Sequence, residues 1–448
     1  MKKIIPIFCL LFLQNVTAQQ INTAKLDSLF DILAAKNLMM GSVAIFKDDK
    51  IVYKKSFGYR YIDGSKKIPA DENTKYRIGS ITKLFTSVMI FQLVQEHKLS
   101  LDTKLATFFP QIKNADKITV ADMMRHRSGI HDASNDKSYL PEMQQTKSEN
   151  DIVKILAKCP SDFEPDTKSA YSNANFTLLG YIVERLDKDS YEGSLKKRIV
   201  NKLHLKNTYV GEAINILGNE SSTYIFNKKK WDSISNELIK IIGKNAVVVG
   251  GAGSLISTPT DLNIFLNALF DDKLISKESL LQDTTVKGDF GMDIYKLPYD
   301  DTFIWGHNGS IGGLYYSDLF TIPKDRITIS VCYNGVNYNT NDILVGILDC
   351  CFDRPIDFAA FNNLDIDTTI LKKYIGVYSS EKFPLKIKIF VEKNQLFAQA
   401  DGQSAFPLSA ISEKEFIFKQ AGIDIIFDTD KSEFTLKQGG GSYLFQKE

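Results

Sequence analysis

The sequence predicts a chain of the α+β class, with an antiparallel sheet flanked by helices, followed by a small all-β barrel or sandwich. The sheet is predicted by β-rich runs that occur both early and late in the first part of the chain, with helical patterns between and beyond them. These runs occupy residues 41–47, 50–57, 303–306, 313–322 and 328–333. Such an order indicates a sheet assembled from the two ends of one domain. The barrel is predicted because the segments after about Asp365 are short, alternating and separated by turns.

The chain has 448 residues, which is too long for a single compact core, so two domains are expected. We place the first at residues 19–360 and the all-β domain at 365–448. A signal peptide is expected at residues 1–18, where Lys2 and Lys3 precede the apolar stretch Ile4–Leu13 and Ala18 stands at the cleavage point. That stretch is too short to span a bilayer, and no later segment is apolar for long enough. The sequence therefore predicts export to the periplasm or the medium without a transmembrane anchor.

Composition and cysteine spacing give no reason to expect a nucleic acid partner or a metal site. Lysine and arginine number 55 against 54 aspartates and glutamates, a formal charge of +1, which gives no electrostatic reason to expect nucleic acid. Four cysteines follow the signal peptide, and none has the spacing of a metal site. They are predicted to be small buried apolar residues. No metal and no cofactor are expected.

Ser80 and Lys83 are the first candidate catalytic pair. On a helix this spacing places both side chains on one face, and a lysine with a lowered pKa can take the serine proton. The same spacing recurs at Ser134/Lys137, Ser194/Lys197 and Ser379/Lys382. Only the first pair opens a helix, predicted from about Ser80 to Glu96, that is apolar nearly all round and must be buried. Burial singles this pair out, because a lysine there needs a partner.

Two further segments carry candidate site residues. Tyr171 and Asn173 are separated by one residue and precede an apolar helix. In such a place a phenol can take part in proton transfer, and an amide can bind the acyl group of the substrate. His307, Gly309 and Ser310 lie in the glycine-rich edge of a predicted strand. Such an edge lets a substrate approach closely, and the backbone amide of Ser310, with that of Ser80, can stabilise an oxyanion.

RIGSITKLF, YSN and HNG, 91 and then 136 residues apart, together resemble the three active-site elements of the serine β-lactamase and penicillin-binding protein superfamily. The similarity covers roughly residues 25–350 and is greatest to the branch that contains the class C enzymes. It implies an α/β sandwich with an additional all-helical subdomain. It also implies an acyl-enzyme on Ser80, proton transfer by Lys83 and Tyr171, and substrate binding by Asn173. The all-β tail resembles lipocalin-like domains appended to such hydrolases.

His307 occupies a position where β-lactamases usually carry lysine. Histidine is mostly neutral at pH 7, so strong dependence on a substrate carboxylate is not expected. The resemblance therefore favours a peptidase, D,D-carboxypeptidase or esterase acting on a small molecule or peptide, such as a fragment derived from peptidoglycan. Two alternatives stay open: a true β-lactamase, and a non-catalytic sensor of cell-wall fragments. His126 and His131 are expected to be structural. The sequence fixes neither the natural substrate nor the oligomeric state.

Overall fold

The computed structural model describes residues 21–133, 136, 148–227, 229–234, 250–288, 290–356, 358–361, 366–392, 395–401, 405–418, 422–438 and 441–448. The signal peptide predicted at residues 1–18 lies outside these residues. Within the described part of the chain, no helix combines the length and apolar character needed to cross a membrane.

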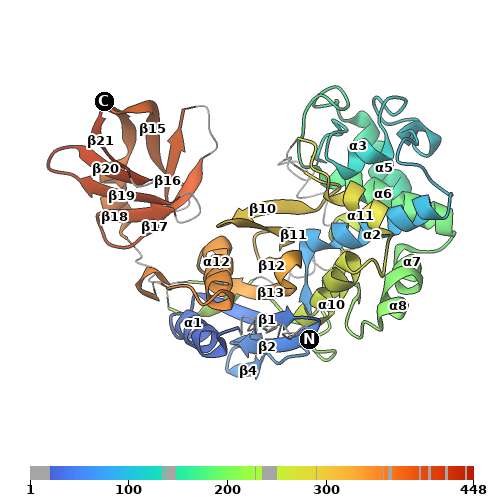
Figure 1. Ribbon diagram of the computed structural model, residues 1–448, viewed down its shortest axis with the longest axis horizontal. Helices are drawn as coiled ribbons and strands as arrows, with labels where there is room; N and C mark the ends of the chain where they lie inside the picture. The colour runs from blue at the N-terminus through green and yellow to red at the C-terminus, as the bar shows by residue number, and fades with distance from the viewer. Residues whose placement is uncertain are drawn as a thin grey trace, which may run out of the picture.

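The centre of the first domain is a six-stranded antiparallel sheet with the order β10-β11-β12-β13-β1-β2 (Figure 1). Its strands are β1 (Met39–Lys47), β2 (Lys50–Phe57), β10 (Tyr295–Tyr299), β11 (Thr302–Ile311), β12 (Tyr315–Ile322) and β13 (Ile327–Val336). β1 pairs with β13, for example Val43 with Val331, so the two ends of the domain meet in mid-sheet. This confirms the predicted fold class and the predicted origin of the sheet.

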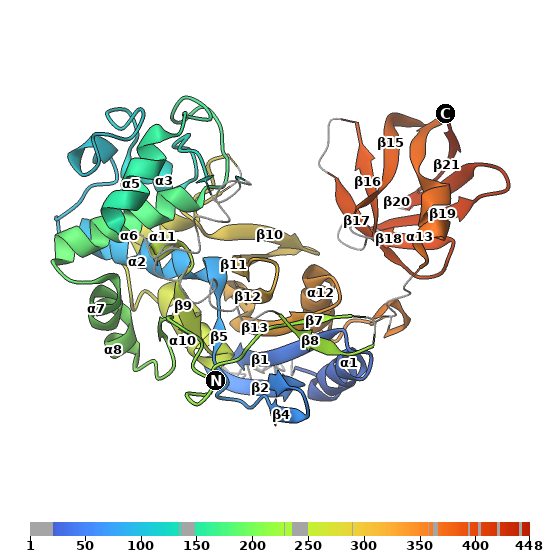
Figure 2. The same cartoon turned by 180° about the vertical axis from the view of Figure 1, so that it is seen from behind.

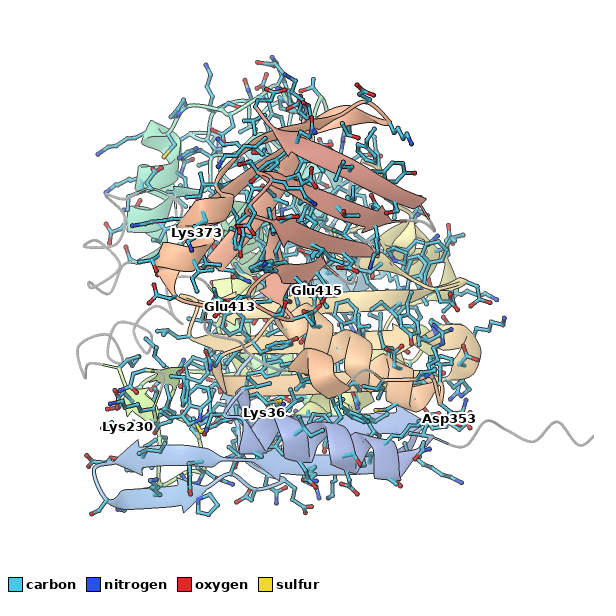
Figure 3. The ribbon with its side chains drawn as sticks, turned by 90° about the vertical axis from the view of Figure 1, so that its left-hand side faces the viewer. Lys36, Lys230, Asp353, Lys373, Glu413 and Glu415 are labelled. Carbon is cyan, nitrogen blue, oxygen red and sulfur yellow. The ribbon has the colours of Figure 1, made fainter. Side chains whose placement is uncertain are left out.

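Helices cover both faces of this sheet. On one face α1 (Thr23–Ala35) and α12 (Thr340–Cys351) lie side by side and share an apolar core with the sheet. Asn22 caps α1 by accepting a hydrogen bond from the amide of Lys25. Figure 3 shows this pair of helices, with Lys36 labelled just beyond α1 and Asp353 just beyond α12.

The opposite face carries α2 (Thr82–Gln95), α6 (Asn173–Asp187) and α10 (Pro259–Phe270), which contribute to a second and larger core (Figure 2). Beyond them lie the remaining short helices of the helical part: α3 (Val120–Met124), α5 (Glu149–Lys158), α7 (Tyr191–Leu195), α8 (Asn201–Leu203) and α11 (Lys277–Thr284). Short strands complete this domain: β3 (Tyr59–Asp63), β4 (Lys66–Pro69), β5 (Tyr76–Arg77), β6 (Tyr209–Val210), β7 (Tyr224–Phe226), β8 (Trp231–Ser233) and β9 (Leu255–Ser257). Helices therefore enclose the sheet face on which the candidate site lies.

The C-terminal part forms a closed eight-stranded barrel, introduced by the short helix α13 (Thr368–Leu371). Its strands are β14 (Gly376–Ser380), β15 (Phe383–Glu392), β16 (Gln395–Ala400), β17 (Phe406–Ala410), β18 (Glu415–Phe418), β19 (Ile423–Asp428), β20 (Glu433–Gln438) and β21 (Gly441–Lys447). Closure pairs β14 with β21 and removes the free edges that an open sheet would expose. Aromatic side chains such as Tyr374, Phe427 and Phe434 fill the interior, which has its own apolar core.

Candidate active site

Ser80 lies at the buried end of α2, in the short 3-10 turn η1 (Gly79–Ile81) that leads directly into the helix. The predicted helix from Ser80 to Glu96 thus begins with a tighter turn than expected. Gly79 has a φ of +52°, a left-handed conformation that glycine adopts without a Cβ clash. α2 is apolar on all sides and packs against α10, where Phe85 stacks on Phe265 with ring centroids 3.7 Å apart. Burial of the whole helix carries Lys83 into the interior.

The hydroxyl of Ser80 is the meeting point of two side chains. The Nζ of Lys83 lies 2.9 Å from its Oγ, and the hydroxyl of Tyr171 donates a hydrogen bond to the same oxygen over 2.7 Å. Ser80 itself is half-buried, whereas Lys83 is fully buried. Three of the residues singled out by the sequence are therefore in direct contact.

Lys83 also donates to two carbonyl oxygens: Oδ1 of Asn173 at 2.9 Å and the backbone oxygen of Ala252 at 2.7 Å. Burial lowers the pKa of Lys83 to about 8, and the charges of Asp293 and Asp132 limit the fall. An amine with this pKa loses its proton within reach of neutral pH. The site can therefore supply a base directly beside the serine hydroxyl.

Asn173 bridges Lys83 and Asp132. Its amide oxygen accepts from Lys83, while its Nδ2 donates to Oδ2 of Asp132 over 3.0 Å. Its backbone N–H, in the first turn of α6, donates to the same carboxylate oxygen over 3.1 Å. The two ends of the amide face partners of opposite kind, which fixes the orientation of the amide. No spacing in the sequence connects Asp132 with Asn173, and only the fold brings them together.

Tyr171 is a neutral phenol in this setting. Burial raises the pKa of its hydroxyl well above the ordinary value, and the nearby charge of Asp293 raises it further. Its ring stacks on the imidazole of His126, with centroids 4.4 Å apart. His126 was expected to be structural, and the structure places it directly behind the candidate phenol. By contrast, His131 lies at the surface, where it pairs with Asp162 and Asp136.

β11 brings the third segment against the serine turn. A Cβ atom at Gly309 would collide with the backbone oxygen of Ile78, and one at Gly79 would crowd the backbone of Ser310. On the neighbouring strand, Ser317 donates to the same oxygen of Ile78 over 2.8 Å. The backbones of Ser310 and of the turn that carries Ser80 are thus in contact. This closeness is what two amides need to face one oxyanion.

His307 completes the group. It is buried, its ring centroid lies 6.3 Å from that of Tyr171, and its Nε2 lies 3.5 Å from Oδ1 of Asp293. Asp293 was not anticipated from the sequence. Within the described residues, no cluster of three or more histidine, cysteine or acidic side chains could hold a metal ion, and the four cysteines 159, 332, 350 and 351 are free thiols.

Comparison with known proteins agrees with this geometry. A family model described as Beta-lactamase matches residues 29–346, the region that holds Ser80, Lys83, Tyr171 and the residues around them. The chain belongs to the β-lactamase family. Among curated relatives, the teichoic acid D-alanine hydrolase of Staphylococcus aureus is 25% identical over 327 residues, which are 69% of this chain and 78% of that protein.

Solved structures share the fold of this β-lactamase-family protein. The octameric penicillin-binding protein homologue from Pyrococcus abyssi has a TM-score of 0.66 at 22% identity and covers 95% of this chain and 99% of its own. The D-amino acid amidase from Ochrobactrum anthropi, complexed with L-phenylalanine, has a TM-score of 0.65 at 22% identity and covers 73% and 98% respectively. Membership of this family agrees with the serine-hydrolase arrangement of Ser80, Lys83 and Tyr171.

Proposed function

We propose that the protein hydrolyses esters or amides of D-amino acids through an acyl-enzyme on Ser80. The observation that carries this proposal is the convergence of Lys83 and Tyr171 on one serine oxygen, at 2.9 and 2.7 Å. A lone serine hydroxyl is a poor nucleophile, and a base and an acid that share its oxygen supply what it lacks. The D-amino acid preference is supported by the names of the relatives, which include a D-alanine hydrolase and D-amino acid amidases.

In the first step Lys83 acts as the base. A neutral amine has two N–H bonds, and both have acceptors, in Asn173 Oδ1 and in the Ala252 carbonyl. Its lone pair is then directed to Ser80 Oγ. As Oγ bonds to the substrate carbonyl carbon, the serine proton passes to Lys83, and the carbonyl oxygen becomes an oxyanion facing the amides of Ser80 and Ser310.

In the second step Tyr171 acts as the acid. The bond from carbon to the leaving oxygen or nitrogen breaks while that atom takes the phenolic proton, which Lys83 then restores. The high pKa of Tyr171 keeps the proton on the phenol until the leaving group needs it. Water next attacks the acyl ester, returns Ser80 to its free form and releases the acid. The sum is one ester or amide and one water converted into an acid and an alcohol or amine.

The proposal has a direct test. We expect the mature chain to cleave D-alanyl esters and D-amino acid anilides faster than their L forms, and a fluorophosphonate to add its mass to the peptide that contains Ser80. Ser80→Ala should abolish both, whereas Ser379→Ala should change neither. Ser379 has a lysine at the same spacing but lies on strand β14 of the barrel, which makes it a matched control.

Other outcomes of the same assay would redirect the proposal. Turnover of nitrocefin at a rate above that of the D-alanyl ester would identify a β-lactamase instead. If no adduct forms on Ser80 and every substrate stays intact, the result would favour a non-catalytic sensor of cell-wall fragments. Preference for peptides that end in D-Ala-D-Ala would identify a D,D-carboxypeptidase. Export through the signal peptide at residues 1–18 is also proposed, and N-terminal sequencing of the secreted protein would check cleavage after Ala18.

A further inference from the structure

A buried carboxylate holds the side chain that in turn holds Lys83. Asp132 is 6% exposed and lies between α3 and α5. Its Oδ2 accepts from the backbone N–H of Asn173 over 3.1 Å and from the Nδ2 of the same residue over 3.0 Å. The first of these donors is one of the amides at the start of α6 that no helical carbonyl can pair. One carboxylate oxygen therefore fixes both the backbone and the side-chain amide of Asn173.

The side-chain amide of Asn173 has an oxygen end and a nitrogen end, and Asp132 determines which way they point. Oδ1 accepts from the Nζ of Lys83 over 2.9 Å. If the amide were reversed, Oδ1 would face the carboxylate of Asp132, and neither oxygen would have a proton to share. A buried acceptor that loses its donor is unfavourable, so the carboxylate selects the observed orientation.

The orientation of this amide matters because Lys83 has only one lone pair as a neutral amine. In the observed arrangement its two N–H bonds are directed to Oδ1 of Asn173 and, over 2.7 Å, to the carbonyl of Ala252. The lone pair is left for Ser80. With the amide reversed, Nδ2 of Asn173 would donate to that lone pair, and an N–H of the amine would turn toward Ser80. The amine could then no longer take the serine proton.

Asp132 also acts on the charge of Lys83. Burial lowers the pKa of Lys83 to about 8, and the charges of Asp293 and Asp132 limit the fall. Two other titratable groups face this amine: Tyr171, whose ring centroid lies 4.8 Å from Nζ, and His126. Burial raises the pKa of Tyr171 and lowers that of His126, so both are neutral at pH 7. The two carboxylates therefore limit how far the pKa of Lys83 falls.

We propose that Asp132 is a positioning residue, which orients Asn173 so that the lone pair of Lys83 stays directed at Ser80. This deepens the proposed function and rests on its assignment of Lys83 as the base, but not on the substrate. Asp132 acts through Asn173 and through its charge. The two contributions can be separated, because one needs only an acceptor atom and the other needs a negative charge.

Asp132→Asn removes the charge and keeps an acceptor. The amide oxygen of the new side chain can still accept from Asn173, so the fold and the orientation of that residue should survive. We expect the pKa of Lys83 to fall further, since one of the two charges that limit the fall is gone. The ¹³Cε signal of labelled lysine follows this titration without any substrate, and Lys83→Met assigns the signal.

Asp132→Leu keeps a side chain of similar size but removes the acceptor as well. Asn173 can then reverse its amide, and we expect acylation of Ser80 by a fluorophosphonate to slow on the order of 100-fold at every pH. In Asp132→Asn, by contrast, the rate should reach nearly the wild-type plateau, at a lower pH. Thermal unfolding shows whether each variant is folded, and Asp132→Ala takes the place of the leucine variant if that one is not.

Asp162→Asn is the matched control. Asp162 is a surface carboxylate that pairs with His131, the residue before Asp132, and its removal should change neither the Lys83 signal nor acylation. An unchanged Lys83 titration in Asp132→Asn, or wild-type acylation in Asp132→Leu, would overturn the proposal. Failure of both the leucine and the alanine variants to fold would also overturn it, because Asp132 would then be a structural residue. If all variants behave as expected and no D-alanyl ester is cleaved, only the substrate class of the proposed function fails.

Discussion

The Nζ of Lys83, in the first turn of α2, lies 2.9 Å from the Oγ of Ser80, in the 3-10 turn that leads into this helix. The amine is held there by hydrogen bonds to Asn173 and to the carbonyl of Ala252, which come from two other segments. Because Asn173 lies in the first turn of α6 and Ala252 in a 3-10 turn at Gly250–Ala252, this chemistry depends on the fold as well as on the local spacing.

Activity should rise with pH through the titration of Lys83. Burial lowers its pKa to about 8, and the base in the proposed first step is the neutral amine. We therefore expect kcat/KM to increase about tenfold per pH unit below the pKa and to level off above it. A pH profile with a D-alanyl ester measures this. Lys83→Arg, whose guanidinium cannot deprotonate, should remove activity at every pH. A profile flat from pH 6 to 9 would contradict the base assignment.

Burial of the Lys83 amine should also lower the free energy of unfolding, by an amount that depends on pH. Because the pKa of Lys83 falls from 10.5 to about 8 on folding, the unfolded chain binds the extra proton between these values. Stability must then rise with pH across that window. Relative to Lys83→Met, the wild-type free energy of unfolding should increase by about 2 kcal/mol from pH 7.5 to 9.5. Urea unfolding of both proteins at each pH gives the comparison, in which the titration of other groups cancels. A constant difference would mean that the amine titrates alike in both states.

Tyr171→Phe should separate good from poor leaving groups. The phenylalanine keeps the ring that stacks on His126 but removes the hydroxyl that donates to Ser80. We expect kcat for an amide to fall by about 10² to 10⁴, since an amine leaving group must be protonated. The leaving group of a p-nitrophenyl ester departs as a stable anion without a proton, so kcat for this ester should fall far less. Measuring both substrates on one variant tests the acid role, and equal losses would assign Tyr171 to the activation of Ser80 instead.

Gly309→Ala should damage the site through the backbone. The new methyl group would collide with the carbonyl oxygen of Ile78, in the residue before Gly79. β11 would have to move off the serine turn, at a cost of about 1 to 3 kcal/mol. Thermal unfolding and acylation of Ser80 by a fluorophosphonate measure the two consequences. Gly312→Ala is the control: near β11 a Cβ at this position meets no atom within 4 Å, so the variant carries only the strain of its left-handed φ of +58°. Loss of acylation in both variants would point to a general effect of glycine replacement.

The sequence allowed prediction of those parts of the site that local spacing encodes. Ser80 and Lys83 are one helical turn apart, and the apolar character of α2 indicated that Lys83 would be buried. Asp293 and His126 lie 167 residues apart, and no pattern in the sequence connects them. Their contact arises from the packing of α3, α6 and the segment before β10. A lone buried histidine is usually structural, so nothing in the local pattern distinguished His126.

In the fold, too, some features could be predicted from local sequence patterns and others could not. The central sheet followed from alternation and turn residues. The sequence also predicts a helix from Pro259 to Phe270, and α10 has these bounds. In the barrel, β17 contains Pro407, and a proline within a run weakens the prediction of a strand. The apolar pattern that follows Tyr171 and Asn173 starts at Phe176 and predicts a helix from there. α6 instead begins at Asn173, because its first turn is held by the carboxylate of Asp132.

The barrel should be dispensable for catalysis by the first domain. Its apolar core is separate from the two cores of that domain, and its contacts include a hydrogen bond of 3.3 Å from Ser409 in β17 to Asp342 in α12. Among the residues that the structure describes, the side chains that hydrogen-bond to Ser80 come from the first domain. We therefore expect a chain that ends at residue 364 to fold and to keep kcat/KM for a small D-alanyl ester within about twofold. The full chain treated in parallel is the reference, with thermal unfolding to confirm that the shortened chain is folded. A folded but inactive truncation would show that the barrel contributes to the site, and loss of activity only towards large envelope polymers would assign the barrel to substrate capture.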